Sequence, residues 1–128
     1  MRFGYVPPPF DGLWPDITRL LDKAVTKGGN RWGDVKAALA TERAQLWLTM
    51  DPAPINATVT RMDGKTLEVW LCGGSVLAGS LHYLETILKA AREIGATDAR
   101  IIGRSGWARV LRPYGWRVQD DEIVKDFA

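Results

Sequence analysis

Hydrophobic and polar positions alternate over residues 67–72, and this period of two is typical of a β-strand. From residue 81 to residue 94 the apolar positions recur at helical spacing, which predicts an amphipathic helix. Ser80 is a suitable N-cap for this helix, and Gly95 can end it. A short apolar strand is predicted at residues 99–102. A strand that leads through a helix to a second strand predicts a right-handed crossover with parallel pairing.

The same patterns predict the other elements of the chain. Helices are expected from Trp14, from Trp32 or Asp34 to about Leu39, and over residues 106–112, the last of them capped by Ser105. Further strands are expected at residues 2–6, 45–50, 55–62, 116–118 and 123–127. This order predicts an α+β fold with a central mixed, mostly antiparallel sheet and helices on both faces. We expect residues 1–13 to form an extended N-terminal arm and residues 14–128 to form one domain.

Composition excludes several classes of function. The chain has 128 residues, of which 46% are apolar and 25% are charged, as in ordinary globular domains. Its net charge of +2 gives no argument for binding to nucleic acid or to a membrane, and no apolar run reaches membrane-spanning length. One Cys and one His cannot make a zinc site of protein ligands alone. The lone Cys and the lack of a signal peptide predict a cytoplasmic protein.

The order of elements and one local segment resemble a known family. Residues 104–116 read RSGWARVLRPYGW, a short predicted helix that ends in a Gly-aromatic pair at Gly115 and Trp116. This segment and the order of elements resemble the GNAT family of N-acetyltransferases. The chain also resembles, in general style, small GNAT-like proteins encoded among the structural genes of tailed bacteriophages. The first resemblance implies a GNAT-like domain, and the second implies a role in a virion or in its assembly.

The GNAT resemblance implies a site for the phosphates of coenzyme A between the fourth strand of the family fold and the central helix. Backbone N–H groups of a Gly-rich loop and the helix N-terminus bind the anion there. The chain lacks the Arg or Gln that leads this loop in the family, and its glycines are spaced differently. Arg104 stands where the family commonly has an Asn, and its guanidinium suits a phosphate. The candidate acetyl-CoA-binding residues are Cys72, Gly73, Gly74, Ser75, Gly79, Ser80 and Arg104. The alternative, which we favour for the loop, is a flexible connection between the strand and the helix that binds no phosphate.

Three further residues are candidates for chemistry. Glu68 lies in the fourth strand, where a GNAT general base is found, but we favour the interpretation that it is a solvated residue on the outer sheet face. Cys72 is a candidate nucleophile or a buried structural residue, and we favour the second interpretation. His82 is a candidate base or a surface residue, and we again favour the second. Leu111 occupies the position of the family's Tyr general acid and cannot donate a proton.

Two functions are compatible with these residues. The first, which we favour, is a GNAT-fold protein with a degenerate acetyl-CoA site that acts without catalysis, through a protein partner or through self-association. The second is an acetyl-CoA-dependent N-acyltransferase that uses Glu68 as base and the loop of residues 73–79 for the phosphates. A nucleic-acid-binding module ranks third, because acidic residues lie among the arginines of the C-terminal half.

Overall fold

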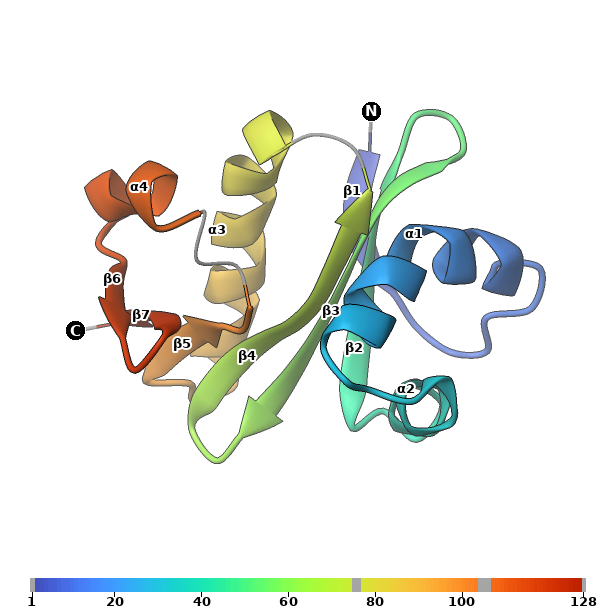
Figure 1. The fold of residues 1–128 in the computed structure, drawn as a ribbon, viewed down its shortest axis with the longest axis horizontal. Coiled ribbons are helices and arrows are strands. Elements are labelled where there is room, and N and C mark those ends of the chain that lie inside the picture. The colour runs from blue at the N-terminus through green and yellow to red at the C-terminus, as the bar shows by residue number, and fades with distance from the viewer. Residues whose placement is uncertain (1, 75–76, 104–106, 128) are drawn as a thin grey trace. The chain divides into compact units, whose positions relative to one another are not determined.

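The computed structural model describes residues 2–74, 77–103 and 107–127. In chain order the elements are β1 (Arg2–Val6), α1 (Trp14–Lys27), α2 (Trp32–Ala40), β2 (Ala44–Met50), β3 (Pro54–Asp63), β4 (Thr66–Gly74), α3 (Leu77–Glu93), β5 (Asp98–Ile101), α4 (Ala108–Leu111), the 3-10 helix η2 (Arg112–Tyr114), β6 (Arg117–Gln119) and β7 (Glu122–Asp126) (Figure 1).

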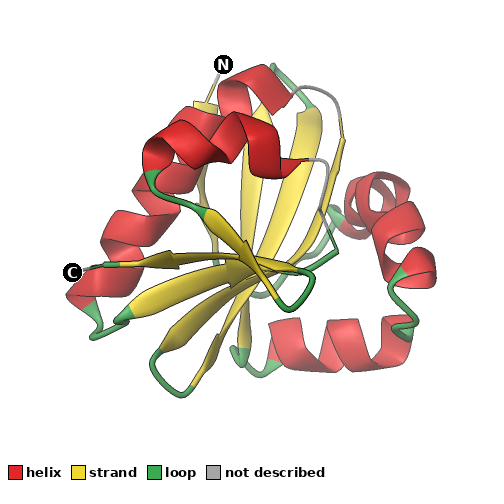
Figure 2. Ribbon diagram, turned by 60° about the vertical axis from the view of Figure 1, so that its left-hand side comes forward, coloured by secondary structure: helices red, strands yellow, loops and turns green. Residues whose placement is uncertain are grey.

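The strands form a seven-stranded sheet in the order β1-β2-β3-β4-β5-β7-β6. β4 and β5 pair in parallel, with α3 between them in the chain, whereas the pairs β1/β2, β2/β3, β5/β7 and β6/β7 are antiparallel. The predicted α+β class, the mostly antiparallel sheet and the parallel crossover pair are confirmed. Figure 2 shows the strands in yellow and the helices in red.

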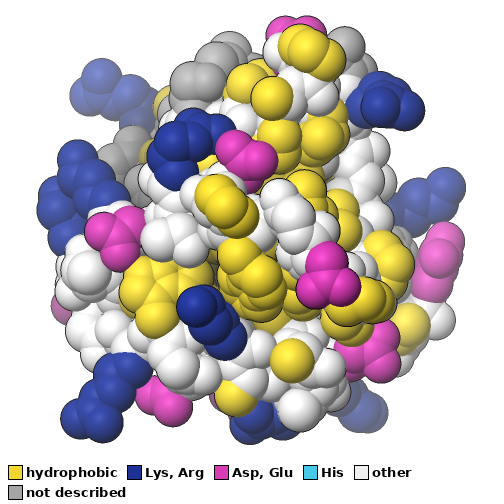
Figure 3. Space-filling model, turned by 90° about the vertical axis from the view of Figure 1, so that its right-hand side faces the viewer, with side chains coloured by type: hydrophobic (Ala, Val, Ile, Leu, Met, Phe, Trp, Pro, Cys, Tyr) yellow, Lys and Arg dark blue, Asp and Glu magenta, His cyan; other side chains and the backbone are white. Residues whose placement is uncertain are grey.

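The chain divides into two compact units, and the first comprises residues 1–61 and 70–76. In this unit the apolar stripe of α1 packs with α2 and with one face of β2 and β3. The fully buried side chains of this core include Ile17, Leu21, Val25, Val35, Leu39, Leu46 and Val59. Pro15 lies in the first turn of α1. Proline suits this position because the N–H groups of the first turn have no acceptor within the helix, so the missing N–H of proline costs no hydrogen bond. Figure 3 shows the face of the molecule with α1 and α2, where apolar side chains gather among scattered Lys and Arg side chains.

The second unit comprises residues 62–69 and 77–128. Its core joins α3 to β5, β7 and the first half of β4, and it also includes Leu111 from α4 and Trp116. The buried side chains are Leu67, Val69, Leu84, Ile87, Leu88, Ala91, Ala99, Ile101, Leu111, Trp116 and Ile123.

Several boundaries differ from the sequence-based predictions. β4 continues through Gly73 and Gly74 and does not stop before them. α3 begins at Leu77, so Gly79 and Ser80 lie within its first turn, and the prediction of Ser80 as N-cap is wrong. Leu77 and Ala78 are strong helix formers, which accounts for the earlier start. The expected helix over residues 106–112 is split into α4 and η2, and Ser105 lies outside the described residues.

The N-terminal residues form part of the sheet. Arg2–Val6 is β1, as predicted, and pairs with β2 in the register Phe3↔Thr49 and Tyr5↔Trp47. That residues 1–13 act as an arm separate from the domain stays a prediction.

Candidate functional site

The distal half of β4 extends past its parallel neighbour. The registered pairs run from Thr66↔Asp98 to Val69↔Ile101, and the N–H of Ile102 donates to the carbonyl of Val69 at 3.3 Å. β5 ends at Ile101, but β4 continues to Gly74. Backbone groups of β4 beyond Val69 therefore have no partner in β5. A strand edge of this kind offers N–H and C=O groups in alternation.

β4 is also irregular in this half. The guanidinium carbon of Arg61 lies 4.0 Å from the ring centroid of Trp70, and Arg61 is two residues from the core residue Val59, so it shares that face of the sheet. A Cβ on Gly73 would lie 1.9 Å from the carbonyl oxygen of Leu20 in α1, so Gly73 faces the same side. Residues three apart on a regular strand point to opposite faces. The regular alternation of side chains between the two faces of the sheet is therefore interrupted once between Trp70 and Gly73.

Cys72 locates this irregularity. Its Sγ lies 3.6 Å from Oγ1 of Thr58, the neighbour of Val59, and so on the opposite face from the core. Trp70 and Cys72 thus point to opposite faces although they are two residues apart, and Leu71 packs in the same core as Trp70. We identify this as a β-bulge at Leu71. Bulges turn backbone groups out of the ladder and occur next to active sites.

The two glycines at the end of β4 are required by packing. Besides the contact of Gly73 with Leu20, a Cβ on Gly74 would lie 2.3 Å from the carbonyl oxygen of Ile55, and Gly74 has φ +118°. A phosphate is therefore not needed to explain either glycine. Among the other predicted cofactor-binding residues, Ser75 and Arg104 lie outside the described residues. Gly79 and Ser80 belong to the first turn of α3, and the side chain of Ser80 lies outside the described part as well.

Glu68 is held in a buried ion pair. Glu68 is 3% exposed. Its carboxylate accepts a hydrogen bond from Nη2 of Arg100, the residue opposite it on β5. Arg100 also contacts Asp63 at 2.7 Å and Glu122 at 3.6 Å. The hydrogen bond to Glu68 raises the pKa of Arg100, against the opposing effect of desolvation. The interpretation of Glu68 as a solvated residue is wrong, because both faces of β4 are covered here.

No protein-family model matches the chain, and no curated protein sequence is significantly similar to it. Solved structures do match over its whole length. A GNAT family acetyltransferase from Elizabethkingia anophelis, with acetyl-CoA bound, aligns with a TM-score of 0.70 at 12% identity over 98% of each chain. The IAA acetyltransferase from Bacillus cereus gives 0.66 at 10% identity over 98% of this chain and 99% of the other. This chain has the GNAT fold.

A larger GNAT-fold enzyme also matches. The N-acetylglutamate synthase from Neisseria gonorrhoeae, in complex with coenzyme A and N-acetyl-glutamate, aligns with a TM-score of 0.72 at 11% identity. The match covers 100% of this chain and 36% of that enzyme. At such identities the likeness is one of fold.

The remaining candidates lie as follows within the GNAT fold. Cys72 is 7% exposed, which confirms the interpretation as a buried residue. His82 is exposed and lies beside Tyr83, with the ring centroids 5.9 Å apart. Leu111 is 1% exposed and belongs to the core, and Tyr114 is half exposed on η2.

Sequence reasoning missed the partner of Glu68. The signal was present, because pairing residues 67–72 in parallel with residues 99–102 brings Glu68 near Arg100. Among the described residues no group of His, Cys, Asp and Glu is arranged to hold a metal ion. None of the described helices is long and apolar enough to span a membrane.

Proposed function

We propose that this chain is an acyl-CoA-dependent N-acyltransferase. The observation that carries the proposal is that β4 extends beyond the end of β5 and has a bulge at Leu71. The solved acetyltransferases of this fold with acetyl-CoA or coenzyme A bound add support. The GNAT fold without catalysis, which the sequence favoured, becomes the second candidate.

The edge of β4 and the start of α3 each suit one part of an acyl-CoA ligand. An extended amide chain such as pantetheine is recognised by the N–H and C=O groups of a strand edge, as in β-strand addition. The N–H groups in the first turn of α3, which begins at Leu77, have no partner within the helix and suit phosphates. When bound, acyl-CoA supplies an acyl thioester that an amine can attack. A preorganised N–H at the β4 edge would stabilise negative charge on the acyl oxygen.

The described side chains provide little proton-transfer chemistry at this site. Leu111 cannot donate a proton, and Glu68, our predicted base, is buried against Arg100. General acid or base catalysis typically contributes a factor of about 10²–10⁴. We therefore expect slow transfer that depends on an amine already neutral in solution, and a rate that rises with pH.

Titration followed by backbone amide NMR tests the site. Coenzyme A should shift the amide signals of Leu71 and Gly73 and those of the first turn of α3. Pantetheine alone should shift only the β4 signals, and ADP only the α3 signals. Signals of β1 serve as the internal control. If millimolar coenzyme A left the β4 amides unmoved, the proposal would be wrong.

Thiol release from acetyl-CoA in the presence of a panel of amines then tests transfer. Cys72 is the only cysteine and is buried, so a thiol reagent gives little background from the protein. Product formation that rises with pH and saturates with acetyl-CoA is the expected result.

A non-catalytic GNAT fold that acts through protein contacts is the second candidate. It is favoured by the buried Leu111 at the position of the family's acid and by the ion pair that holds Glu68. Coenzyme A binding without thiol release from acetyl-CoA for any amine would favour it. The role in a phage virion or its assembly stays a prediction.

A further inference from the structure

The sheet ends on one side at β1, a strand with few of the features that keep sheet edges from pairing. Among the described residues β1 has a strand neighbour on one side only, β2. Alternate N–H and C=O groups along Arg2–Val6 therefore point away from the sheet. Natural edge strands are commonly kept short, charged or interrupted by a bulge or a proline. β1 pairs with β2 over five residues without a register shift, and Arg2 is its only charged residue.

The opposite edge of the sheet has a different character. β6 consists of three residues, all of them exposed, and begins with the charged Arg117. Two further charges, Asp120 and Asp121, follow in the turn to β7. A short and charged edge of this kind resists pairing with another chain. Of the two edges of the described sheet, β1 is therefore the one suited to extension by an added strand.

Two aromatic side chains of β1 lie on the face of the sheet that is turned away from α1 and α2. The rings of Phe3 and Tyr5 each lie 5.7 Å from the ring of Trp47 on β2, measured between centroids. Leu46 and Leu48, the neighbours of Trp47, belong to the core with α1 and α2, so all three rings lie on the other face. Tyr5 is still 43% exposed beside Trp47. Its ring can therefore pack against the side chains of an added strand.

We propose that β1 pairs with β1 of a second copy in antiparallel orientation and so joins the two sheets in a homodimer. The twofold axis lies at Gly4, the middle residue of the strand, because this register pairs all five residues. Phe3 of one copy is then directly opposite Tyr5 of the other. Opposite residues of an antiparallel pair share a face, so the four rings form one row between the two Trp47 side chains. Each copy has one such edge, and association therefore ends at two chains.

Charge and length select a second copy as the occupant of this edge. Arg2 lies opposite Val6 of the other copy, so the two Arg2 residues are four positions apart, about 14 Å at about 3.4 Å per residue. This separation exceeds the Debye length of about 10 Å at 0.1 M salt, whereas a parallel pair would place the two charges side by side. An acidic strand of another protein would bring carboxylates beside the rings. Pro7 has no N–H and ends the strand, so the matching segment has the length of β1 itself.

Cysteine substitutions test the register. Cys72, the natural cysteine, is buried and gives little background. No atom lies within 4 Å of a Cβ added to Gly4, and Gly4→Cys should form a disulfide-linked dimer on mild oxidation. Phe3→Cys mixed with Tyr5→Cys should form a mixed disulfide, whereas Phe3→Cys alone should stay unlinked, because its two copies are two residues out of register. Gly33→Cys, at an exposed glycine of α2 that also has no neighbour, is the control and should stay unlinked.

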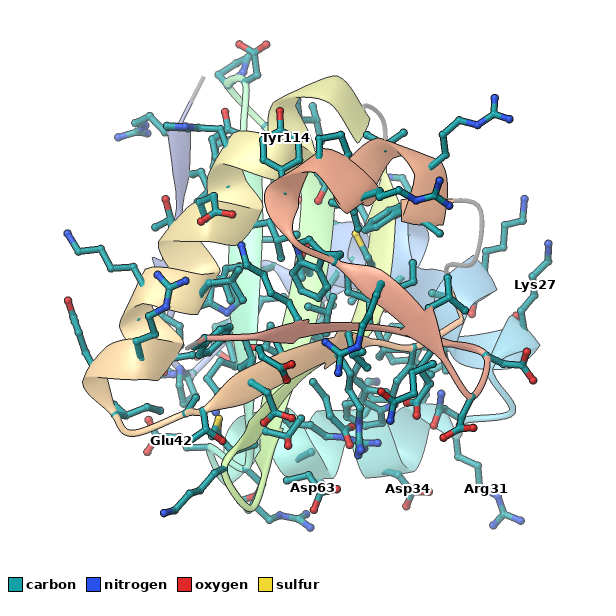
Figure 4. The ribbon with its side chains drawn as sticks, turned by 90° about the vertical axis from the view of Figure 1, so that its left-hand side faces the viewer. Lys27, Arg31, Asp34, Glu42, Asp63 and Tyr114 are labelled. Carbon is teal, nitrogen blue, oxygen red and sulfur yellow. The ribbon has the colours of Figure 1, made fainter. Side chains whose placement is uncertain are left out.

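Sedimentation velocity tests the dimer without a cross-link. Tyr5→Lys places a charge in the row of rings and should raise the dimer dissociation constant at least about tenfold, with the circular dichroism spectrum of the natural chain. Tyr114→Lys makes the same change at a half-exposed tyrosine of the second unit, labelled on η2 in Figure 4, and should leave the dissociation constant unchanged. A natural chain that is monomeric at high micromolar concentration would overturn the proposal. So would linking of Phe3→Cys alone as readily as Gly4→Cys. Neither result bears on acyl-CoA binding.

Discussion

Arg100 donates a hydrogen bond to the carboxylate of Glu68 from the directly opposite position on the neighbouring parallel strand. The carboxylate is almost fully buried, and the side chain of Arg100 is 28% exposed. The guanidinium also reaches Asp63 at the end of β3. The pair therefore links β4 to β5 through side chains, in addition to the backbone ladder.

We expect Glu68→Gln to lower the free energy of unfolding by about 1–3 kcal/mol, because an ion pair with a buried carboxylate becomes a hydrogen bond from the charged guanidinium to a neutral amide. Urea denaturation measures this loss. Asp63→Asn is the matched control: the side chain of Asp63 is 66% exposed, so its contact with Arg100 should contribute less than about 1 kcal/mol.

The same variant separates a structural from a catalytic Glu68. Since the carboxylate is held by Arg100, the rate of acyl transfer per folded molecule should not change in Glu68→Gln. A fall of about 100-fold or more at unchanged coenzyme A affinity would instead identify Glu68 as the general base.

The glycines at the end of β4 should tolerate no side chain. Gly73→Ala places a Cβ against the carbonyl oxygen of Leu20. Gly74→Ala places a Cβ against the carbonyl oxygen of Ile55, and the positive φ at this position strains any residue other than glycine. Each should cost about 1–3 kcal/mol in chemical denaturation. Gly33→Ala in α2, where no atom lies within 4 Å of the added Cβ, should gain up to about 1 kcal/mol. If a Gly73 or Gly74 variant loses coenzyme A binding, its stability must also be measured, because unfolding alone would abolish binding.

The sequence predicted the elements well because the apolar periods of α1, β2 and β3 are unambiguous. It also predicted the parallel pairing of β4 with β5, which follows from the helix between them. It could not predict the burial of Glu68, because the alternation of Leu67, Val69 and Leu71 indicates one covered face, and the residues between them are buried as well. Coverage of both faces is a property of a central strand, set by elements far away in the chain.

The details of the candidate site were harder to predict. The bulge at Leu71 follows from contacts of Trp70 with Arg61 and of Cys72 with Thr58, which join residues distant in sequence. Gly73 and Gly74 suggested a phosphate loop, but close approach of backbone explains them equally well, and a sequence does not distinguish the two.

Restoring a tyrosine at Leu111 should not restore a general acid. Leu111 is 1% exposed in the core of the second unit, so Leu111→Tyr would bring a larger ring and a hydroxyl group into a packed interior. We expect a loss of stability of about 1–3 kcal/mol and no gain in thiol release from acetyl-CoA. Leu111→Met, which nearly conserves volume, is the control and should cost less than about 1.5 kcal/mol. A tenfold faster transfer by Leu111→Tyr would contradict the core position of this residue.

β1 should contribute to stability through its aromatic side chains. The rings of Phe3 and Trp47 are stacked, with centroids 5.7 Å apart and planes inclined by 8°, and Trp47 donates a hydrogen bond to Thr60 at 3.0 Å. Phe3→Ala should cost about 0.5–1.5 kcal/mol beyond the loss of buried apolar area. Tyr5→Ala should cost less, because Tyr5 is 43% exposed and its ring is tilted by 58° to that of Trp47.

Removal of residues 1–6 tests whether the N-terminus is an arm or a strand of the fold. Without β1 the edge of β2 loses its ladder partner, and the shortened chain should unfold at a lower urea concentration. Hydrogen exchange of the β2 amides that now bond to β1 should accelerate in step with this loss. Unchanged stability and unchanged exchange would instead mean that β1 does not contribute to the free energy of unfolding, as expected of an arm that is separate from the domain.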